Sequence, residues 1–450
     1  MTNFRKNSRE DNYFFLRFFR AKINSGALLI IVACLAIFVA NSPWADFYNS
    51  LWNHPVLLQV GSFNLFSHDG HPMTVMSFIN DALMAVFFFS IGLEIKREVL
   101  VGQLSSFRRA MLPVCAAFGG MIFPVLIYHL IAPTGVESSG LAIPMATDIA
   151  FSLGVLSMFG NRVPLSLKIF LTAFAVVDDI GGILVIALFY SNGIETMYLI
   201  GAGILLLILF IGNRRRVMTS SFYLLLGIGV WYMTLQSGIH STIAGVLVAF
   251  MVPAIPQINV SKYINRISEG VKDFPTNGKK SSIILNSHEL IALHLIESAS
   301  KHVVSPLQRL EDSMHGLINF LVMPLFAFAN AGVSLASGTQ LVGIVSIGVT
   351  SGLVLGKFVG ILLFTWLAIK IRLVRLPDNM NWPMVAGVAL LGGIGFTVSL
   401  FISNLSFADT APALLNQAKM GVFSGTIIAG TLGVLVLSFV LPKRQSKKEI

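Results

Sequence analysis

Stretches of about 20 apolar residues recur along this chain of 450 residues, and they constrain its fold more than any other feature. A helix of ~20 residues crosses a hydrocarbon core of ~30 Å and satisfies its own backbone hydrogen bonds. Apolar residues make up 55% of the chain, charged residues 12%, and the mean hydropathy is +0.79, outside the range of soluble globular domains. A transmembrane β-barrel would show alternating segments of about ten residues instead. The sequence therefore predicts an all-α polytopic membrane protein.

Twelve transmembrane helices are predicted, and they form one transmembrane domain over residues 26–441. Residues 1–25 precede it as an N-terminal segment whose aromatic and basic residues predict an interfacial helix. A polar stretch, 257–310, forms a long cytoplasmic insertion between helices 8 and 9, and 442–450 is a basic tail. The predicted spans are 26–42, 74–95, 109–131, 138–159, 165–190, 195–212, 218–235, 239–256, 314–333, 341–369, 382–403 and 416–441.

Lysine and arginine residues are distributed by membrane side. They precede the first span and recur in every second loop, whereas the loops at 43–73, 132–137, 191–194, 236–238, 334–340 and 404–415 contain none. Cytoplasmic loops are enriched in these residues, so both termini are predicted to be cytoplasmic. The net charge of +10 then favours anionic lipid of the cytoplasmic leaflet as a partner. No basic groove motif supports binding of nucleic acid.

Asp178 and Asp179 lie side by side near the centre of the fifth predicted span. Even on the lower published scale an aspartate at the centre of a membrane helix costs ~2.5–3.5 kcal/mol, so its presence indicates a function. Adjacent helical residues project about 100° apart, so one carboxylate can face a water-filled cavity while the other meets a partner in the bundle. A packed pair that merely joins helices is the structural alternative.

Asp148 lies in the fourth predicted span, which Pro144 interrupts. A proline removes one backbone donor and frees a carbonyl about four residues earlier. Freed carbonyls, the Thr147 hydroxyl and a carboxylate are the oxygen ligands that a hard cation prefers. A proline kink with an N-capping threonine or aspartate would explain the same residues without a ligand.

Lys357 and a glycine-rich stretch, 391–400 (LGGIGFTVSL), interrupt two later spans. Lys357 is too deep to snorkel to either interface, so it is expected to meet an opposite charge, either as a static salt bridge or as part of a proton-exchanging pair. Residues 394–398 (IGFTV) echo 149–153 (IAFSL) of the fourth span. Two interrupted spans in corresponding halves of a chain indicate a transporter binding site.

Five motifs resemble the NhaA family of sodium/proton antiporters, in the same order and over a similarity that runs from about residue 25 to the last span. Together they are highly specific for that family. The motifs are 80–88 (NDALMAVFF), 92–98 (GLEIKRE), 146–151 (ATDIAF), 177–181 (VDDIG) and 324–332 (PLFAFANAG).

The resemblance implies twelve helices with inverted repeats, formed here by spans three to five and ten to twelve, in which the broken fourth and eleventh spans cross. It implies electrogenic exchange of Na⁺ or Li⁺ for protons in a bacterial inner membrane, serving pH homeostasis and salt tolerance, with no cofactor. Asp179 would be the principal cation ligand, Asp178 would pair with Lys357, and Asp148 with Thr147 would support them. Asp148 would also offset the positive ends of the broken helices, and Lys357 the negative ends.

A second group of charged residues resembles the family's pH-responsive positions. Glu94 and Glu98 share a helix face near the cytoplasm with Arg97 close by, and Glu311 and His315 repeat that spacing. Histidine and clustered carboxylates titrate near neutrality, although a solvated helix end would also explain them. The weaker candidates for the pH response are Asp81 and His240.

Two departures from the family pattern concern loops. The insertion at 257–310 is unusually long and directly precedes Glu311, which affects the expected pH response rather than the exchange. The outer loop at 55–71 occupies the place of a β-hairpin for dimerisation, but its hydrophobic alternation is poor, so a possible homodimer is implied only by the resemblance.

Two other functional classes compete with exchange. A sodium-coupled symporter of an organic solute could share broken helices and membrane aspartates. An intramembrane aspartyl protease needs aspartates from two helices, one of them in Gly-x-Gly-Asp, and that motif does not occur. No phosphate loop, nucleophile elbow or metal-binding histidine cluster supports an enzyme.

Overall fold

The structure is a computed structural model that describes most of the chain between residues 25 and 442. The predicted interfacial helix, most of the insertion at 257–310 and the basic tail lie outside the described residues. Within this range the residues not described are 58, 61–62, 65, 69–70, 191–192, 194, 256–260, 262, 266, 269–289, 292, 295–303, 336–339 and 409.

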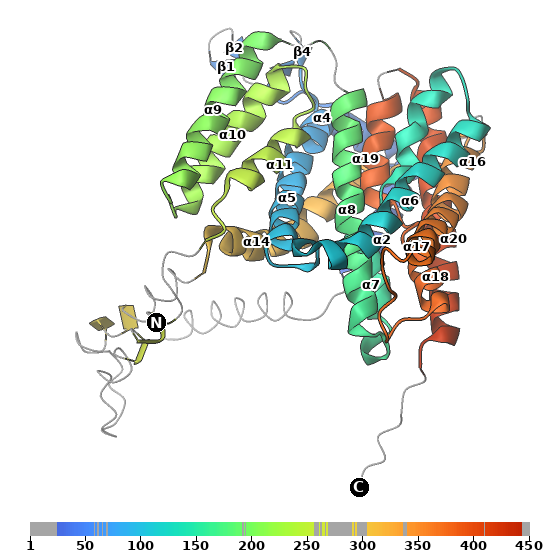
Figure 1. The fold of residues 1–450 in the computed structure, drawn as a ribbon. Coiled ribbons are helices and arrows are strands. Elements are labelled where there is room, and N and C mark those ends of the chain that lie inside the picture. The colour runs from blue at the N-terminus through green and yellow to red at the C-terminus, as the bar shows by residue number, and fades with distance from the viewer. Residues whose placement is uncertain are drawn as a thin grey trace, which may run out of the picture. The chain divides into compact units, whose positions relative to one another are not determined.

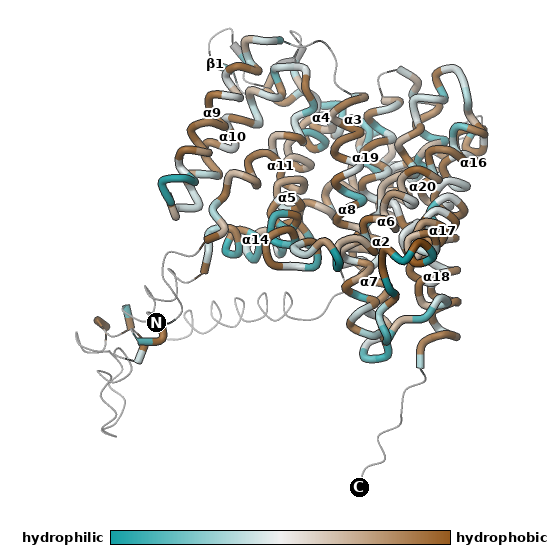
Figure 2. The backbone as a smooth tube through the Cα atoms, in the orientation of Figure 1, coloured by the Kyte–Doolittle hydropathy of each residue, from teal (hydrophilic) through white to brown (hydrophobic). Residues whose placement is uncertain are grey.

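The described chain is a membrane bundle of apolar helices, as predicted. Seven helices are long and apolar enough to cross a membrane, and up to ten spans result if each of three bent pairs is one span. Helices α10 and α11 lie at the positions of the two remaining predicted spans but are shorter than a membrane span, so the number of twelve spans stays a prediction. Figure 2 shows the apolar colouring that follows these helices, interrupted by polar segments.

The chain divides into two compact units. Unit 1 comprises residues 1–80, 103–190 and 319–450, and unit 2 comprises 81–102 and 191–318. The helices of unit 2 are α5 (Met84–Leu100), α9 (Thr196–Arg214), α10 (Ser220–Gln236), α11 (Thr242–Met251) and α14 (Pro306–Leu317). Figure 1 shows α9, α10, α11 and α5 running beside one another in that order, and α11 packs closely on α5.

Unit 1 holds two groups of described elements. Its outer elements and first spans are α2 (Ser25–Ala40), α3 (Ala45–Asn53), β1 (Gln59–Val60), β2 (Phe63–Asn64), β3 (Ser67–His68), β4 (His71–Pro72), α4 (Val75–Phe78), η2 (Gln103–Ser105), α6 (Phe107–Ile131), η3 (Val136–Met145), α7 (Ile149–Ser157), η4 (Gly160–Arg162) and α8 (Leu165–Phe189). Its C-terminal elements are α15 (Met323–Asn330), α16 (Ile344–Ser351), η6 (Gly352–Gly356), α17 (Lys357–Lys370), α18 (Trp382–Leu391), α19 (Phe396–Phe407) and α20 (Pro412–Val440).

Small residues let the long helices of unit 1 approach closely. A Cβ atom at Gly119 of α6 would collide with the carbonyl of Gly360 in α17, and the reverse substitution would collide with the carbonyl of Gly119. Close backbone approach at small residues is how membrane helices gain packing energy, because lipid provides no hydrophobic drive between them. This contact fixes α17, the helix that begins with Lys357, against α6.

The start of the ninth span and the outer loop both differ from the sequence prediction. The ninth span begins at Pro306 rather than near residue 314, because Ser305 and Gln308 form a capping box and proline occupies the first helical position. In the outer loop the structure has two short antiparallel hairpins, β1 with β2 and β3 with β4, despite the poor alternation of the sequence. An isolated bridge between Pro55 and Thr74 closes the loop at its base.

Three π-helical segments interrupt described spans. They are η1 (Ile79–Leu83), η5 (Ile318–Val322) and η6 (Gly352–Gly356). A π-helical turn holds one more residue than an α-helical turn and is frequent at functional sites. The segment η6 directly precedes Lys357, and a Cβ atom at Gly356 would lie 2.6 Å from the Cα of Pro124, so only glycine fits there without a shift.

Candidate functional site

Two broken helices meet within unit 1. The segments η3 and α7 bend by 42° at residues 146–148, and α18 and α19 bend by 44° at 392–395. The echoed residues of the two breaks face each other, because the rings of Phe151 and Phe396 lie with centroids 5.9 Å apart. The similar breaks and the ring contact are consistent with the predicted crossing of the fourth and eleventh spans.

One carboxylate caps the positive ends of both broken helices. Asp148 Oδ1 accepts a hydrogen bond from the backbone N–H of Phe151 in α7 at 3.0 Å. Its Oδ2 accepts from the backbone N–H of Thr397 at 3.2 Å and from the Thr397 hydroxyl at 2.7 Å, at the start of α19. Helix N-termini carry a partial positive charge, so a buried carboxylate between two of them is stabilised twice.

The opposing carbonyl ends are capped by hydroxyl and amide donors. At the end of α18, Gly392 O accepts from the Thr147 hydroxyl at 2.7 Å, Leu391 O from the Ser152 hydroxyl at 2.9 Å, and Ile394 O from the Asp148 N–H at 2.7 Å. In the other direction, the Ser399 hydroxyl donates to Ile143 O at 2.7 Å. The two broken spans therefore hold each other by reciprocal capping.

Lys357 and Asp178 form an ion pair inside the bundle. The Nζ of Lys357 lies 2.6 Å from Asp178 Oδ2, and both side chains are 0% exposed. The ammonium also lies 5.7 Å from the ring centroid of Phe174, within the range of a cation–π contact. The partner that the depth of Lys357 predicted is thus Asp178. The hydrogen bond of Lys357 to Asp178 does not reach the helix ends that the resemblance assigned to the ammonium, so that role stays a prediction.

The second carboxylate of the pair lies in the same buried site. Asp179 is 4% exposed and acts electrostatically on Lys357. Thr147, in the break of the fourth span, is 1% exposed. Asp178 Oδ1 is buried without a hydrogen-bond partner among the described residues, although a buried carboxylate oxygen is normally satisfied.

The chemistry of these groups suits a hard monovalent cation or a proton. Carboxylates, a hydroxyl and freed carbonyls are oxygen donors, and a buried negative charge needs neutralisation by a proton, a cation or an ammonium. In the described part of the chain, no group of three or more His, Cys, Asp or Glu residues is arranged to hold a resident metal ion. Asp179, Asp178 and Thr147 are therefore candidate ligands for a transient ion.

The predicted pH-responsive residues form a cluster in unit 2. Arg97 on α5 contacts Glu98 Oε1 at 3.3 Å and Glu311 Oε1, on α14, at 3.2 Å. Glu94 lies in the field of both these carboxylates, of Arg97 and of His315. The early start of α14 places Glu311 on the second helical turn rather than at a loop end. The structure therefore brings together all five residues of this prediction.

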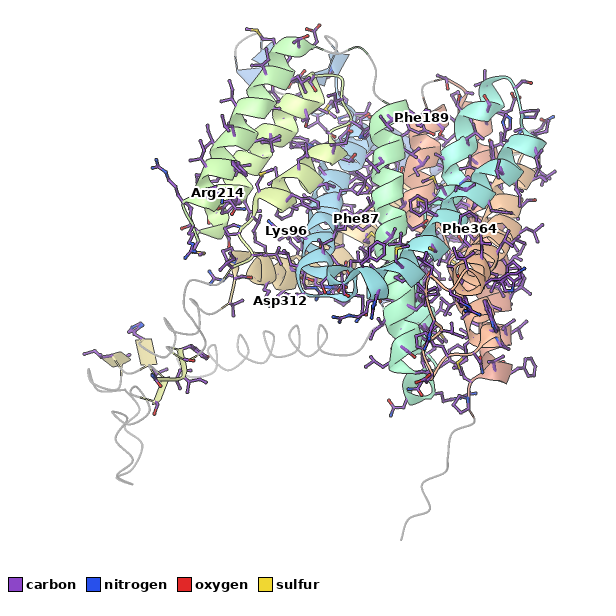
Figure 3. The ribbon with its side chains drawn as sticks, in the orientation of Figure 1. Phe87, Lys96, Phe189, Arg214, Asp312 and Phe364 are labelled. Carbon is purple, nitrogen blue, oxygen red and sulfur yellow. The ribbon has the colours of Figure 1, made fainter. Side chains whose placement is uncertain are left out.

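Lysine 96 has a different role from its charged neighbours. Its ammonium donates to Phe250 O at 2.6 Å and to Val252 O at 2.5 Å, at the carbonyl end of α11. Figure 3 labels Lys96 on α5 together with Asp312 on α14. A cation at a helix C-terminus offsets the partial negative charge there, so Lys96 fastens α11 to α5.

Asp81 and His240, the weaker pH candidates, lie in unit 2 away from that cluster in sequence. Asp81 Oδ1 accepts a hydrogen bond from the Ser241 hydroxyl at 3.1 Å, and His240 Nδ1 lies 3.1 Å from the Thr242 hydroxyl. His240 directly precedes the N-cap residue of α11.

Sequence reasoning missed two residues of the helix crossing and one buried lysine elsewhere in unit 1. Thr397 and Ser152 occupy equivalent positions of the echo between 394–398 and 149–153, so the echo itself could have identified them. Lys419 lies within α20, is 6% exposed and donates to Gly332 O at 3.2 Å. A lysine inside an apolar span, the signal that identified Lys357, applies to Lys419 as well.

Comparison with known proteins shows one family over almost the whole chain. Residues 16–437 match the family described as Na+/H+ antiporter 1. A protein of Phocaeicola vulgatus named Na(+)/H(+) antiporter NhaA is 59% identical over 97% of this chain and 98% of its own length. Proteins of the same name from Bacteroides fragilis (56% identity, 94% and 97% coverage) and Porphyromonas gingivalis (43%, 95% and 96%) are also similar.

Proposed function

The chain belongs to the Na⁺/H⁺ antiporter 1 family of multi-pass membrane transporters, and from this premise we propose that it exchanges Na⁺ or Li⁺ for protons at Asp178 and Asp179. The transported ions are substrates and not cofactors, and transport rather than enzymatic turnover is its activity. The observation that carries the proposal is the buried ion pair of Lys357 and Asp178 beside Asp179 at the helix crossing.

The proposed mechanism is competition for one buried site. Asp179 is the principal ligand of the dehydrated cation, with Thr147 and Asp178 contributing oxygens. When the cation leaves, protons neutralise the carboxylates, since a bare charge in this low-dielectric site costs several kcal/mol. The Lys357–Asp178 pair gives the site a second stable state, because Asp178 is neutralised by the ammonium when neither Na⁺ nor a proton is bound to it.

Asp148 has a supporting part in the proposed site. Its carboxylate already accepts three hydrogen bonds from Phe151 and Thr397, which makes it less suited than Asp179 to bind an ion directly. It holds the two broken helices so that the Thr147 oxygen and the carbonyl ends keep their positions. We therefore assign Asp148 to positioning and Asp179 to binding.

Alternating access completes the proposed cycle. Motion of one repeat-based bundle exposes the site first to one side of the membrane and then to the other, and the proton gradient expels sodium. If more protons than cations move per cycle, the exchange is electrogenic and responds to the membrane potential. Glu94, Arg97, Glu98, Glu311 and His315 are proposed to adjust activity to cytoplasmic pH.

The setting proposed for this activity is a bacterial inner membrane with both termini in the cytoplasm. The distribution of lysine and arginine supports that orientation and a contact with anionic lipid of the inner leaflet. The hairpins of the outer loop provide backbone edges for a homodimer.

A vesicle assay tests the proposed exchange. Everted membrane vesicles holding the protein are acidified by respiration, NaCl or LiCl is added, and the collapse of the proton gradient is followed with a fluorescent amine between about pH 6 and pH 9. Collapse that exceeds that of empty vesicles supports exchange. A response equal to empty vesicles across the whole range contradicts it, and sodium-dependent uptake of an organic solute would favour the symporter.

A further inference from the structure

Two transmembrane spans begin in one unit and end in the other. The span Val75–Leu100 passes from unit 1 to unit 2 between Asn80 and Asp81. The span Pro306–Asn330 passes from unit 2 to unit 1 between Ile318 and Asn319. The other two passages, after residues 102 and 190, lie outside these spans. A regular α-helix behaves as a rigid rod. If the two units rotate relative to each other, these two spans must therefore bend along their length.

Both passages coincide with a π-helical segment. The Asn80–Asp81 boundary lies in η1, and the Ile318–Asn319 boundary lies in η5. A π-helical turn breaks the regular hydrogen-bond ladder and is one of the few identified causes of helix bending. The third described π-helical segment, η6, lies entirely inside unit 1 and thus provides an internal comparison.

Adjacent residues of η1 are bound to different units. Asn80 Oδ1 accepts a hydrogen bond from Asn330 Nδ2 at 2.8 Å, and Asn330 Oδ1 in turn accepts from Asn404 Nδ2 at 2.7 Å, all within unit 1. The next residue, Asp81, accepts from Ser241 within unit 2. The side chains on either side of the boundary are therefore each anchored to their own unit.

The two helices that flank η5 are likewise each anchored to a different unit. On the unit 2 side, Glu311 of α14 is held by Arg97. On the unit 1 side, the Tyr48 hydroxyl donates to Phe328 O at 2.5 Å near the end of α15, where Asn330 joins the amide chain. Five residues of π-helix thus separate two firmly held helices.

We propose that η1 and η5 are the two flexing points of the transport cycle, and that Asn80 and Asp81 are positioning residues that confine bending to η1. The inference rests on the alternating access of the proposed function. Bending within a π-helical turn changes the direction of a span while both flanking helices keep their contacts. The segment η6 does not connect the two units. Its role is instead to set the direction in which Lys357, the next residue, projects from the helix.

Matched single-residue deletions test the assignment. Leu321 of η5 and Leu355 of η6 are both exposed leucines inside five-residue π-helical segments, and deletion of one residue restores a regular α-helical turn. Deletion of Leu321 is expected to lower the turnover of exchange by about tenfold or more, since a conformational step limits many transport and catalytic cycles, with equilibrium binding of ²²Na⁺ unchanged. Deletion of Leu355 is expected to weaken ²²Na⁺ binding itself.

Wild-type turnover after deletion of Leu321, or equal losses of binding and turnover, would overturn the assignment. If the deleted protein fails to assemble, Asn80→Ala and Ser241→Ala replace it, with a severalfold loss of turnover expected at unchanged ²²Na⁺ affinity. Hydrogen–deuterium exchange separates this inference from the proposed function, because it needs no transport. Amides of residues 79–83 and 318–322 are expected to exchange faster than those of 352–356, and equal protection would refute flexing even in a working antiporter.

Discussion

Charged side chains are held in contrasting ways at the helix crossing of unit 1 and at the contact of α5 with α14 in unit 2. Lys357 and Asp178 are wholly buried and meet at a single short contact. Arg97 is 38% exposed and shared between Glu98 and Glu311. A buried pair has few stable charge states, whereas a partly solvated cluster titrates gradually. This difference supports the proposal that ion exchange takes place at the first arrangement and adjustment by pH at the second.

The largest difference in exchange rate is expected between variants that remove one carboxylate from the helix crossing and one from the cluster in unit 2. Asp179→Asn should reduce Na⁺-dependent proton movement to that of empty vesicles, because an amide cannot neutralise a dehydrated cation. Glu98→Gln should keep the maximal rate, since the cluster binds no transported ion. Both are measured in everted vesicles at matched protein levels. Full exchange by Asp179→Asn would remove the binding role from this residue and leave the antiporter assignment intact.

Replacing the basic residue of each arrangement should lower the free energy of unfolding by different amounts. Lys357→Met leaves Asp178 buried and uncompensated, which typically costs ~3–5 kcal/mol in free energy of unfolding. Arg97→Met breaks a partly exposed contact, for which ~0–1 kcal/mol is usual. Thermal unfolding in detergent reports the two shifts in Tm. Lys357→Arg, which keeps a cation, serves as the control, and equal losses from both methionine variants would contradict the comparison.

Among the hydrogen bonds that cap the broken helices, those to a charged group should contribute more stability than those to a neutral group. Thr397→Val removes a hydroxyl bond to the Asp148 carboxylate, and hydrogen bonds to charged groups contribute ~1.5–3 kcal/mol. Ser152→Ala removes a bond between a hydroxyl and the neutral Leu391 carbonyl, for which ~0.5–1.5 kcal/mol is typical. The variants are compared by Tm and by the half-saturating Na⁺ concentration. A larger loss of stability from Ser152→Ala than from Thr397→Val would show that Asp148 does not make the main contact between the two spans.

In the cluster of unit 2 we expect a shift in pH response with little loss of rate. Arg97→Gln removes the positive charge that lies 3.2 Å from Glu311, so the Glu311 carboxylate releases its proton at a higher pH. If deprotonation activates exchange, the half-activating pH rises while the rate at alkaline pH is retained. The measurement is the pH profile of the vesicle assay. An unchanged profile would reduce the cluster to a structural contact.

The smallest effect is expected at His240. His240 is far in sequence from the cluster of Glu94, Arg97, Glu98, Glu311 and His315, and its Nδ1 lies 3.1 Å from the Thr242 hydroxyl. His240→Gln should therefore leave the pH profile between about pH 6 and pH 9 unchanged. His315→Gln provides the comparison inside the cluster. A shift with His240→Gln and none with His315→Gln would relocate the pH response.

The buried charges show which parts of the site could be predicted from the sequence. Asp178, Asp179 and Lys357 are conspicuous because charge inside an apolar span is rare and costly. Lys419 gives the same signal and was overlooked, because it lies near the beginning of a predicted span. Thr397 and Ser152 give only a faint signal, since hydroxyl residues are common in membrane helices and their importance depends on the carbonyl or carboxylate opposite them.

Span positions, their order and the depth of the charged residues were determined by the sequence alone, because each depends on local runs of apolar residues measured against the thickness of a bilayer. The partners were decided only by the tertiary structure. Thr397 meets Asp148 across 249 residues, and Lys357 meets Asp178 across 179. The π-helical turns were also invisible in the sequence, because an extra residue in a turn follows from how the flanking helices are held, which no local pattern records.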